Sequence, residues 1–546
     1  MMKKNTQKNL FKHLLFCSLL GFSSHVFSAN VPAGTALAEN QTFRYDNGAD
    51  PASIDPQKVQ EDAGSNIVRQ LFETLVISDA KGNLLPGAAE KWQHSEDYKT
   101  WTFHLRKNAK WSNGDPVLAS DFVFAFRRLA DPKTAATYAS YLEYLKLAHA
   151  SDIIAGKQPL DALGIQALDD HTLTLTLSES VPYLDKLLEY PALAPVNQKV
   201  VEKYGDAWIK VENMVGNGPF KLTNWIINEK LEMEANPHYW DHKNTLLTKV
   251  IMYPISSDNI SYTRYRANEL DIARFPSELR AKVKKELASE VHIAPFLSTY
   301  YYELNHNVEP TKNKWVRQAL SLALERHIIT DKVLGNGQVP AYSFTPPYIS
   351  GGHKIQAPEW STWSQKERNQ KAIELLKQAG YSQDNPLRFT LLYNTSEGHK
   401  SIAIAAASIW KKNTDKLVDV KLENQEWKTF LDTKNSGHYT VARSGWNADY
   451  NDASTFLNIY LSTSTNNAAG YKNALYDQQL AQSFSVQNEE ERAEVYAKAQ
   501  AILDEDFATL PIYYYTSVKL IKPNVKGFAF GHPTNAYYFK DVYLTQ

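Results

Sequence analysis

The chain has 546 residues, of which 22% are charged, with 59 Lys and Arg against 60 Asp and Glu. A chain of this length is too long for a single hydrophobic core, so more than one domain is expected. The balanced charge leaves no basic surface of the kind that nucleic-acid-binding proteins carry, which excludes that class of partner.

Residues 1–29 have the pattern of a cleavable export signal. An apolar run from Leu14 to Phe22 is too short to span a bilayer and is followed by the small-residue cleavage site Ser28-Ala29. Cys17 is the only cysteine, and it follows Phe16, where a lipoprotein signal would have a small residue, so no lipid anchor is expected. The run is preceded by four lysines, namely Lys3, Lys4, Lys8 and Lys12.

The mature chain is therefore expected in the periplasm of a Gram-negative cell. With the four signal lysines removed from the 59 basic residues, against 60 acidic ones, its net charge is about −5. No later segment reaches eighteen apolar residues, so no membrane span is expected. Without cysteines the mature chain depends on core burial for its stability, despite the oxidising compartment.

Helical and strand periodicities alternate along the chain. Residues 101–105 and 173–177 alternate apolar and polar side chains, which predicts strands. Apolar stripes with helical spacing occur in 122–129, which follow Asp121, and again in 316–323 and in 372–379, where Gly380 ends the stripe. These patterns predict a mixed α/β fold, and the absence of long Pro/Gly linkers indicates domains joined by short crossings.

The chain is rich in aromatic residues, with 12 Trp, 31 Tyr and 22 Phe. Most of these belong to ordinary core. The clusters at 299–302 and 512–515, however, alternate between two faces, so that half of each cluster is expected to face something other than its own core. Tyrosine suits the wall of a cavity that accepts varied side chains, because it combines a rigid ring with one adaptable hydroxyl.

Sequence motifs of hydrolases are missing. There is no G-x-S-x-G, no H-E-x-x-H, no P-loop and no cysteine nucleophile in the mature chain, so an enzyme is not expected. The nearest approach to a calcium loop, Asp449-x-Asn451-x-Ala453, lacks the later oxygen ligand and glycine. We therefore expect neither a metal site nor a cofactor.

Residues 441–458 place one cation and one anion around a short apolar run. Arg443 and Asp449 are six residues apart, a span of at most about 20 Å in extended chain. This spacing suits a ligand with an amine at one end and a carboxylate at the other, such as a short peptide, with Ser444, Gly445 and Trp446 supplying backbone and an aromatic wall. The alternative is an internal salt bridge between Arg443 and Asp449.

Ordered motifs over nearly the whole mature chain resemble the extracytoplasmic solute-binding proteins of peptide ABC transporters, family 5. The motifs include PGAAEKW, VGNGPFKL, RYRANELDIA, LLYNTSEGHK and NQEWKTFLDT. The resemblance implies a two-lobed periplasmic binding protein fold (type II, cluster C), with three domains and the ligand cleft between the lobes. Domain I is expected at 30–73, 198–297 and 517–546, domain II at 74–197 and domain III at 298–516.

The resemblance also implies roles for individual residues. Asp449 matches an acid that receives the peptide amine, and Arg443 and His399 match cations that receive the carboxylates of peptides of different lengths. Gly445 and Asn447 match the strand that pairs with the peptide main chain. Residues that match walls of the cleft are Tyr138, Tyr301, Trp427 and Trp446.

Three departures from the family are visible. A disulfide of the best-known relatives has its partners at Ser298 and Asn447 here, so that staple is absent. A lysine that meets longer peptides falls at Leu334. Lys434 and Asn435 stand where relatives have Arg and His. These changes bear on the preferred length and composition of the ligand.

The sequence therefore predicts a non-catalytic, monomeric carrier of short peptides that delivers them to an ABC permease of the inner membrane. A narrower ligand, such as a murein tripeptide, haem or glutathione, is an alternative, and a secreted peptidase is a more distant one.

Overall fold

The computed structural model describes residues 31–484, 486 and 488–546. The predicted export signal at 1–29, including Cys17, lies outside the described residues. Within the described part of the chain, none of the helices combines the length and the apolar character needed to cross a membrane.

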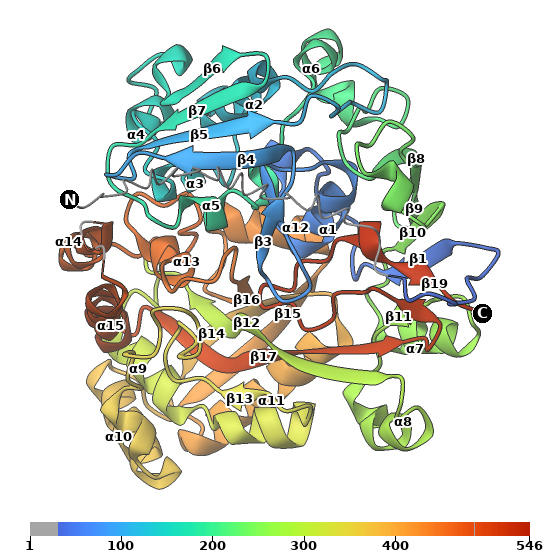
Figure 1. Ribbon diagram of the computed structural model, residues 1–546. Helices are drawn as coiled ribbons and strands as arrows, with labels where there is room; N and C mark the ends of the chain where they lie inside the picture. The colour runs from blue at the N-terminus through green and yellow to red at the C-terminus, as the bar shows by residue number, and fades with distance from the viewer. Residues whose placement is uncertain (1–30, 485, 487) are drawn as a thin grey trace, which may run out of the picture.

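A large sheet runs through the whole molecule (Figure 1). It has eleven strands, ten of them in the order β15-β14-β16-β12-β17-β11-β1-β10-β9-β8, with β13 paired to β17. Their bounds are β1 Thr42–Asp46, β8 Phe220–Ile226, β9 Lys230–Ala235, β10 Lys249–Tyr253, β11 Ile272–Ala273, β12 Val291–Leu304, β13 Val339–Pro340, β14 Leu387–Asn394, β15 Val418–Gln425, β16 Val441–Asn447 and β17 Thr509–Ile521.

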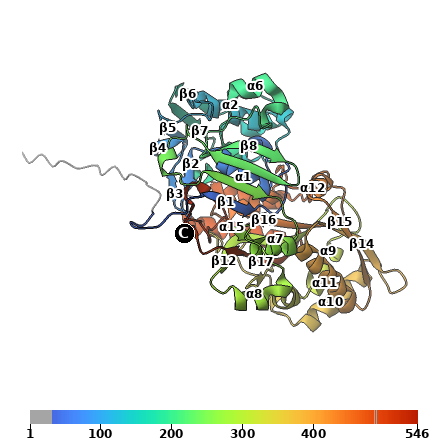
Figure 2. The same cartoon turned by 90° about the vertical axis from the view of Figure 1, so that its right-hand side faces the viewer.

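The long strands β12 and β17 connect two lobes. The first lobe holds the segments before β12 and those after β17, and the second lobe holds the segments between them (Figure 2). The ladder between β12 and β17 is interrupted, because Pro295 pairs with Thr516 but the next pair is Thr299 with Tyr514. Such a bulge bends a strand locally and increases its twist.

A separate antiparallel sheet of four strands, in the order β4-β5-β7-β6, forms the outer end of the first lobe (Figure 1). The strands are β4 Ala89–His94, β5 Thr100–Leu105, β6 Ile165–Asp169 and β7 Thr172–Thr176. The two predicted strands are thus confirmed as β5 and β7. Trp101, Phe103 and Leu105 are buried on one face, while Thr102 and His104 remain partly accessible on the other.

The three predicted helices are also confirmed, as α2 Ala119–Ala130, α9 Lys314–Ala323 and α10 Gln365–Gln378. The predicted apolar stripes of α2 and α9 are buried throughout, because the helical repeat brings them to one face. Asp121 lies inside the first turn of α2 and accepts from the backbone N–H of Leu118 at 2.9 Å. After α10, Gly380 has a positive φ of 90°, a conformation that favours glycine and ends the helix.

The remaining elements cover the sheets or join them. The other helices are α1 Asp62–Leu71, α3 Tyr141–Tyr144, α4 Ala150–Ile154, α5 Leu184–Leu187, α6 Gln198–Tyr204, α7 Asp258–Arg266, α8 Arg280–Glu286, α11 Glu397–Asn413, α12 Trp427–Asn435, α13 Ser454–Leu457, α14 Ala474–Ala481 and α15 Glu489–Glu505. Short strand pairs are β2 Val76–Ser78 with β3 Leu84–Pro86, and β18 Val525–Lys526 with β19 Tyr543–Leu544. One large hydrophobic core fills the first lobe and also includes Tyr450 of the second lobe, while two further cores lie within the second lobe.

Candidate ligand-binding site between the lobes

Strand β16 carries the cation and backbone of the candidate site. It lies between β14 and β12, with Arg443 opposite Tyr302, Gly445 opposite Tyr300 and Asn447 opposite Ser298. Arg443, Gly445 and Asn447 alternate along the strand and therefore share a face. Gly445 is exposed because β14 pairs with β16 only at Val441 and Ala442, which leaves this edge of β16 without a partner strand beyond them among the described residues. A Cβ at Gly445 would lie 3.3 Å from both Arg443 Nη2 and Tyr515 Oη. Its backbone is thus accessible to a ligand.

Arg443 has no acidic partner among the described residues. Its Nη2 donates to the hydroxyl of Tyr515 at 2.8 Å, and its guanidinium lies 5.1 Å from the ring centroid of Tyr300. Its Nε has no hydrogen-bond partner in the described part of the chain. The charge of Arg443 is held by aromatic rings and remains available to an anion.

Asp449 follows β16 by two residues and is likewise without an ion pair in the described structure. Burial raises the pKa of its carboxyl well above the usual range, with Arg69 lowering it and Asp62 raising it further. After burial, the charge of Asp449 is the next cause that raises the pKa of Tyr138, Tyr141 and Tyr190, so these three tyrosines lie in the neighbourhood of Asp449.

The structure therefore contradicts the alternative of an internal salt bridge between Arg443 and Asp449. Neither side chain is neutralised by the other, nor by another charged residue within 4.0 Å among the described residues. In the empty protein it is costly to ionise the buried Asp449 carboxyl, just beyond the end of β16, and to leave the Arg443 cation within that strand without a counterion. A zwitterionic ligand would relieve both costs.

His399 lies in the first turn of α11, where its backbone N–H donates to Ser396 Oγ at 3.4 Å. Its ring is 5.7 Å from that of Tyr300, so it lies near Arg443. Burial lowers the pKa of His399 well below its usual value, and the charges of Arg443 and Arg274 lower it further. The ring is therefore neutral at neutral pH until an anion approaches.

We expect peptides whose carboxylate meets His399 to take up protons on binding. The ligand charge raises the pKa of the ring above its depressed ligand-free value, so affinity should increase as pH falls through the bound-state pKa. Calorimetry of one peptide in phosphate and in Bis-Tris at pH 6 measures the proton uptake from the difference in the heat of binding. Asp449 releases protons in both proteins when it pairs with an amine. The proton uptake by His399 is therefore the difference in net proton exchange between the native protein and the variant His399→Gln. Equal proton exchange in the two proteins for every peptide length would contradict the assignment.

Aromatic residues from both lobes close the candidate site. The ring of Trp446 stacks on that of Tyr138 of the first lobe with centroids 6.1 Å apart. Trp427 begins α12 and stacks on Phe430 at 5.8 Å, and the buried cluster around Phe430 also packs against Ala52 of the first lobe. The indole N–H groups of Trp427 and Trp446 have no acceptor in the described part of the chain.

Tyr301 is not brought to this group. It is 2% exposed, packs edge-on against Phe344 at 4.9 Å, and belongs to the buried cluster against which Trp446 packs. It faces away from Arg443 because alternation along β12 puts Tyr300 and Tyr302 on the opposite face. Tyr301 therefore packs in the cluster that supports Trp446, whereas the resemblance to the family implied a position in the wall of the cleft.

Three charged or polar residues that sequence reasoning missed join the site: Asp62, Tyr515 and Lys519. Lys519 follows Tyr515 by four residues on β17, hence on the same face, and burial lowers its pKa to about 8. Burial raises the pKa of Asp62, yet its side chain is exposed. Only the tyrosine cluster at 512–515 gave a sequence signal, for Tyr515.

The charged groups of the candidate site are accessible to solvent although much protein surrounds them, and the region between the lobes in which they lie is called the hollow below. Asp62 is exposed, and His399, Arg443, Asp449 and Lys519 are partly accessible. Burial nonetheless disfavours the charged forms of Asp62, His399, Asp449 and Lys519, as their pKa shifts show. Contacts between the lobes border this region, since Asn447 donates to Asp62 and the ring of Trp446 stacks on that of Tyr138.

The sites of the three family departures are occupied as follows. Ser298 Oγ donates to Asn447 Oδ1 at 2.5 Å across the β12–β16 pair. Leu334 is 8% exposed and packs in the core of the second lobe. Lys434 forms an ion pair with Glu303 at 3.3 Å. Asn435 Nδ2 donates a hydrogen bond to Gln60 Oε1 of the first lobe at 2.8 Å.

We expect thermal stability of the mature protein to be indifferent to reductant. A hydrogen bond between Ser298 and Asn447 stands where relatives are expected to have a disulfide, and the only cysteine lies in the predicted signal. Melting temperature with and without dithiothreitol measures this, since losing a native disulfide typically costs about 2 to 5 kcal/mol. A clear fall in melting temperature would contradict the predicted cleavage after Ala29.

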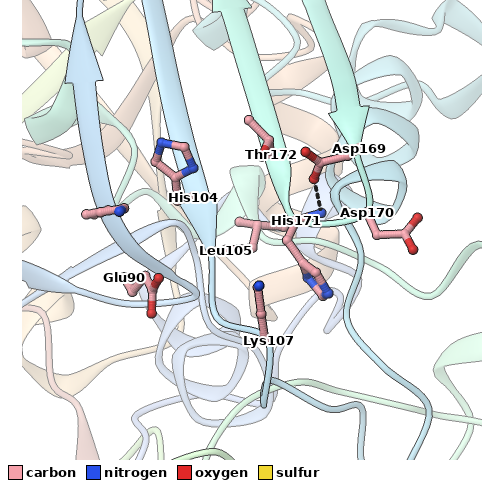
Figure 3. A pocket seen from close by; sticks show the side chains of 9 residues that line it. Glu90, His104, Leu105, Lys107, Asp169, Asp170, His171 and Thr172 are labelled. Atoms are coloured by element: carbon pink, nitrogen blue, oxygen red, sulfur yellow. Dashed lines mark hydrogen bonds between the residues drawn. The ribbon is translucent and has the colours of Figure 1, made fainter.

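A polar depression elsewhere on the molecule does not fit a ligand of this kind. It lies on β4, β5 and the turn from β6 to β7, and its lining includes Glu90, His104, Lys107 and Asp170 (Figure 3). Charges of both signs point into it without convergence on one point. No group of three or more His, Cys, Asp or Glu that could hold a metal occurs among the described residues.

Comparisons with known proteins agree with this geometry. Residues 83–468 match the model of the bacterial extracellular solute-binding proteins, family 5. The chain is 51% identical over 534 residues to the periplasmic oligopeptide-binding protein OppA of Haemophilus influenzae, covering 97% of this chain and 99% of that protein. The structure of Haemophilus influenzae OppA in complex with the peptide RPPGFSPFR matches with a TM-score of 0.92 and 52% identity, covering 93% of this chain and 100% of that one.

A second relative provides two conformations. The murein tripeptide-binding protein MppA of Escherichia coli matches with a TM-score of 0.92 and 42% identity, over 94% of this chain and 100% of that chain. Its unliganded open form matches with a TM-score of only 0.66 at 41% identity, over 94% and 99% of the two chains. The arrangement of the lobes described above is therefore unlike that open form.

Two lobes that meet around a pair of charged groups without ion-pair partners, together with these relatives, define a solute-binding protein. This chain belongs to the bacterial extracellular solute-binding proteins of family 5.

Proposed function

We propose that this protein captures short peptides in the periplasm and delivers them to an ABC permease of the inner membrane. The observation that carries the proposal is the pair of unneutralised charges, Arg443 and Asp449, flanking the accessible backbone of Gly445. A peptide added to this strand would satisfy its main chain whatever its sequence, and would place its termini at the two charges. The periplasmic names of the relatives support the compartment, and OppA of Haemophilus influenzae has been solved with a peptide.

The roles of the site residues are part of the same proposal. Asp449 receives the amine, Arg443 or His399 receives the carboxylate according to peptide length, and Gly445 and Asn447 pair with the main chain. Trp427, Trp446 and Tyr138 form walls. We also propose that the protein binds its ligand without catalysis, which membership of a binding-protein family supports, and that it acts as a monomer.

Calorimetry with trialanine tests the proposal, with the peptide recovered afterwards and examined by mass spectrometry. We expect saturable binding and intact peptide. Hydrolysis of the peptide would establish a peptidase instead, and absence of binding to any free peptide would overturn peptide capture. Native mass spectrometry of protein isolated from its own periplasm would distinguish a broad peptide ligand from murein tripeptide, haem or glutathione.

The division into domains is also proposed, with domain I at 30–73, 198–297 and 517–546, domain II at 74–197 and domain III at 298–516. The break in the β12–β17 ladder between Pro295 and Thr299 supports the boundary near residue 297. The four-stranded sheet, which lies wholly within 74–197, supports a separate domain II.

We expect peptide to shift the protein from an open to a closed population. The bulge in β12 provides a flexible crossing, and the largely separate cores of the lobes allow them to move as rigid bodies. Small-angle scattering should show a smaller radius of gyration at saturating trialanine than in the ligand-free protein. An unchanged radius, in a sample shown to be open at the start, would count against closure.

A further inference from the structure

Asp62 contributes a carboxylate to the hollow from the first lobe, at the start of α1. The residue is exposed and accepts a hydrogen bond from Asn447 of the second lobe, so it lies where the two lobes meet. No cation lies within 4.0 Å of it among the described residues. Like Asp449, Asp62 therefore has no ion-pair partner among the described residues.

Asn447 holds this carboxylate from the second lobe. Its Oδ1 accepts from Ser298 Oγ at 2.5 Å, which turns its Nδ2 toward the first lobe. Nδ2 then donates to Asp62 Oδ2. Because only one carboxylate oxygen is engaged, Asp62 Oδ1 has no hydrogen-bond partner in the described part of the chain and remains able to accept one.

The position of Asp62 relates it to the amino end of a bound peptide. Asn447 precedes Asp449 by two residues and shares the face of Gly445, so Asp62 faces this part of β16 across the hollow. A peptide whose amine meets Asp449 would pass Asp62 with one of its first residues. A side chain directed toward the first lobe would then meet the free oxygen.

Cations already in the hollow do not fill this role. Arg69, Lys519 and Arg443 act on Asp62 from beyond ion-pair distance, in that order, and Arg443 is bonded to Tyr515. Charge near Asp62 is therefore shared at long range, and a direct partner is missing.

We propose that Asp62 makes the site selective for peptides with a lysine or arginine side chain near the amino end, and that Asn447 is the residue that positions it. This inference rests on the proposed peptide-binding function and names a ligand class within it.

The test uses two pairs of free tripeptides in which lysine is replaced by the uncharged norleucine. The pairs are Lys-Ala-Ala with norleucine-Ala-Ala, and Ala-Lys-Ala with Ala-norleucine-Ala. In the native protein, calorimetry should give a dissociation constant at least about tenfold lower for lysine than for norleucine in one pair. In Asp62→Asn, which keeps the acceptor for Asn447 but removes the charge, that ratio should fall to within about twofold.

Two further variants test whether the position of the carboxylate matters and whether the same substitution elsewhere has no effect. Asn447→Ala should reduce the ratio, because the carboxylate loses its donor. Asp384→Asn makes the same chemical change at an exposed loop residue and should preserve the ratio. Melting temperatures establish that each variant is folded.

A native protein without preference for lysine in either pair would overturn the inference, and so would a preference that survives Asp62→Asn. A preference for peptides with glutamate at the same positions would overturn it as well, by assigning the selectivity to Lys519 or Arg69. Failure of the proposed function is a separate result, because then neither lysine nor norleucine peptides would bind.

Discussion

Replacing Asp449 by alanine should weaken the binding of free tripeptides by about 3 to 5 kcal/mol, roughly a hundredfold to several thousandfold in dissociation constant. The peptide amine would then enter a poorly hydrated hollow without its anion, and Tyr138, Tyr141 and Tyr190 supply hydroxyls but no charge. N-acetylated tripeptides should bind the native protein more weakly than free tripeptides by a similar free energy, since acetylation removes the positive charge of the amine that pairs with Asp449. Calorimetry with free and acetylated trialanine measures both effects.

Combining the substitution of Asp449 with acetylation of the peptide tests whether both changes remove the same interaction. In Asp449→Ala, free and acetylated peptides should bind with similar affinity, because the coupling between the two charges is already lost. Asp449→Asn should behave in the same way while keeping the volume of the side chain. Equal affinity of the native protein for free and acetylated trialanine would exclude an amine-binding role for Asp449.

Local patterns predicted much of the fold and part of the site. The stripes of α2, α9 and α10 and the alternation of β5 and β7 were readable because helix and strand repeats depend only on neighbouring residues. Arg443, Gly445 and Asp449 were readable for the same reason, since one strand and its extension carry all three.

Contacts between distant segments could not be predicted in this way. Asp62 meets Asn447 across 385 positions of sequence, and no local repeat marks either as a partner of the other. Tyr301 illustrates a different limit. Alternation indicates which tyrosines of β12 share a face, but it does not indicate which face meets the ligand. That choice depends on β16 and β17, which flank β12.

The family departures also acquire a physical meaning only in three dimensions. Asn435 and Asn447 were noted as changes that affect ligand preference or remove a disulfide. In the structure both donate side-chain hydrogen bonds to one segment of the first lobe, at Gln60 and Asp62. Such bonds form only when the lobes approach each other, so these two amides stabilise the closed arrangement as well as shaping the site.

Replacing Arg443 by alanine should produce an effect that depends on peptide length. A peptide whose carboxylate meets Arg443 loses its cation in a poorly hydrated space and should bind about 3 to 5 kcal/mol more weakly. A longer or shorter peptide whose carboxylate meets His399 should lose less, about 1 kcal/mol, since only the long-range charge of Arg443 is removed. His399→Ala should show the opposite dependence. Calorimetry with free alanine peptides of two to five residues gives both profiles.

Two matched changes identify the cause of the loss. In the native protein, a peptide with a C-terminal amide should bind as weakly as the free peptide of the same length binds Arg443→Ala. In Arg443→Ala, the amide should weaken binding little further, because the charge pair is already lost. Tyr515→Phe removes the hydroxyl that holds Arg443 Nη2 at 2.8 Å but keeps the guanidinium, so it should reproduce the length profile at a smaller amplitude. A uniform loss at all lengths in Arg443→Ala would instead assign Arg443 to the support of β12 and β17, through Tyr300 and Tyr515, and would remove it from the ligand.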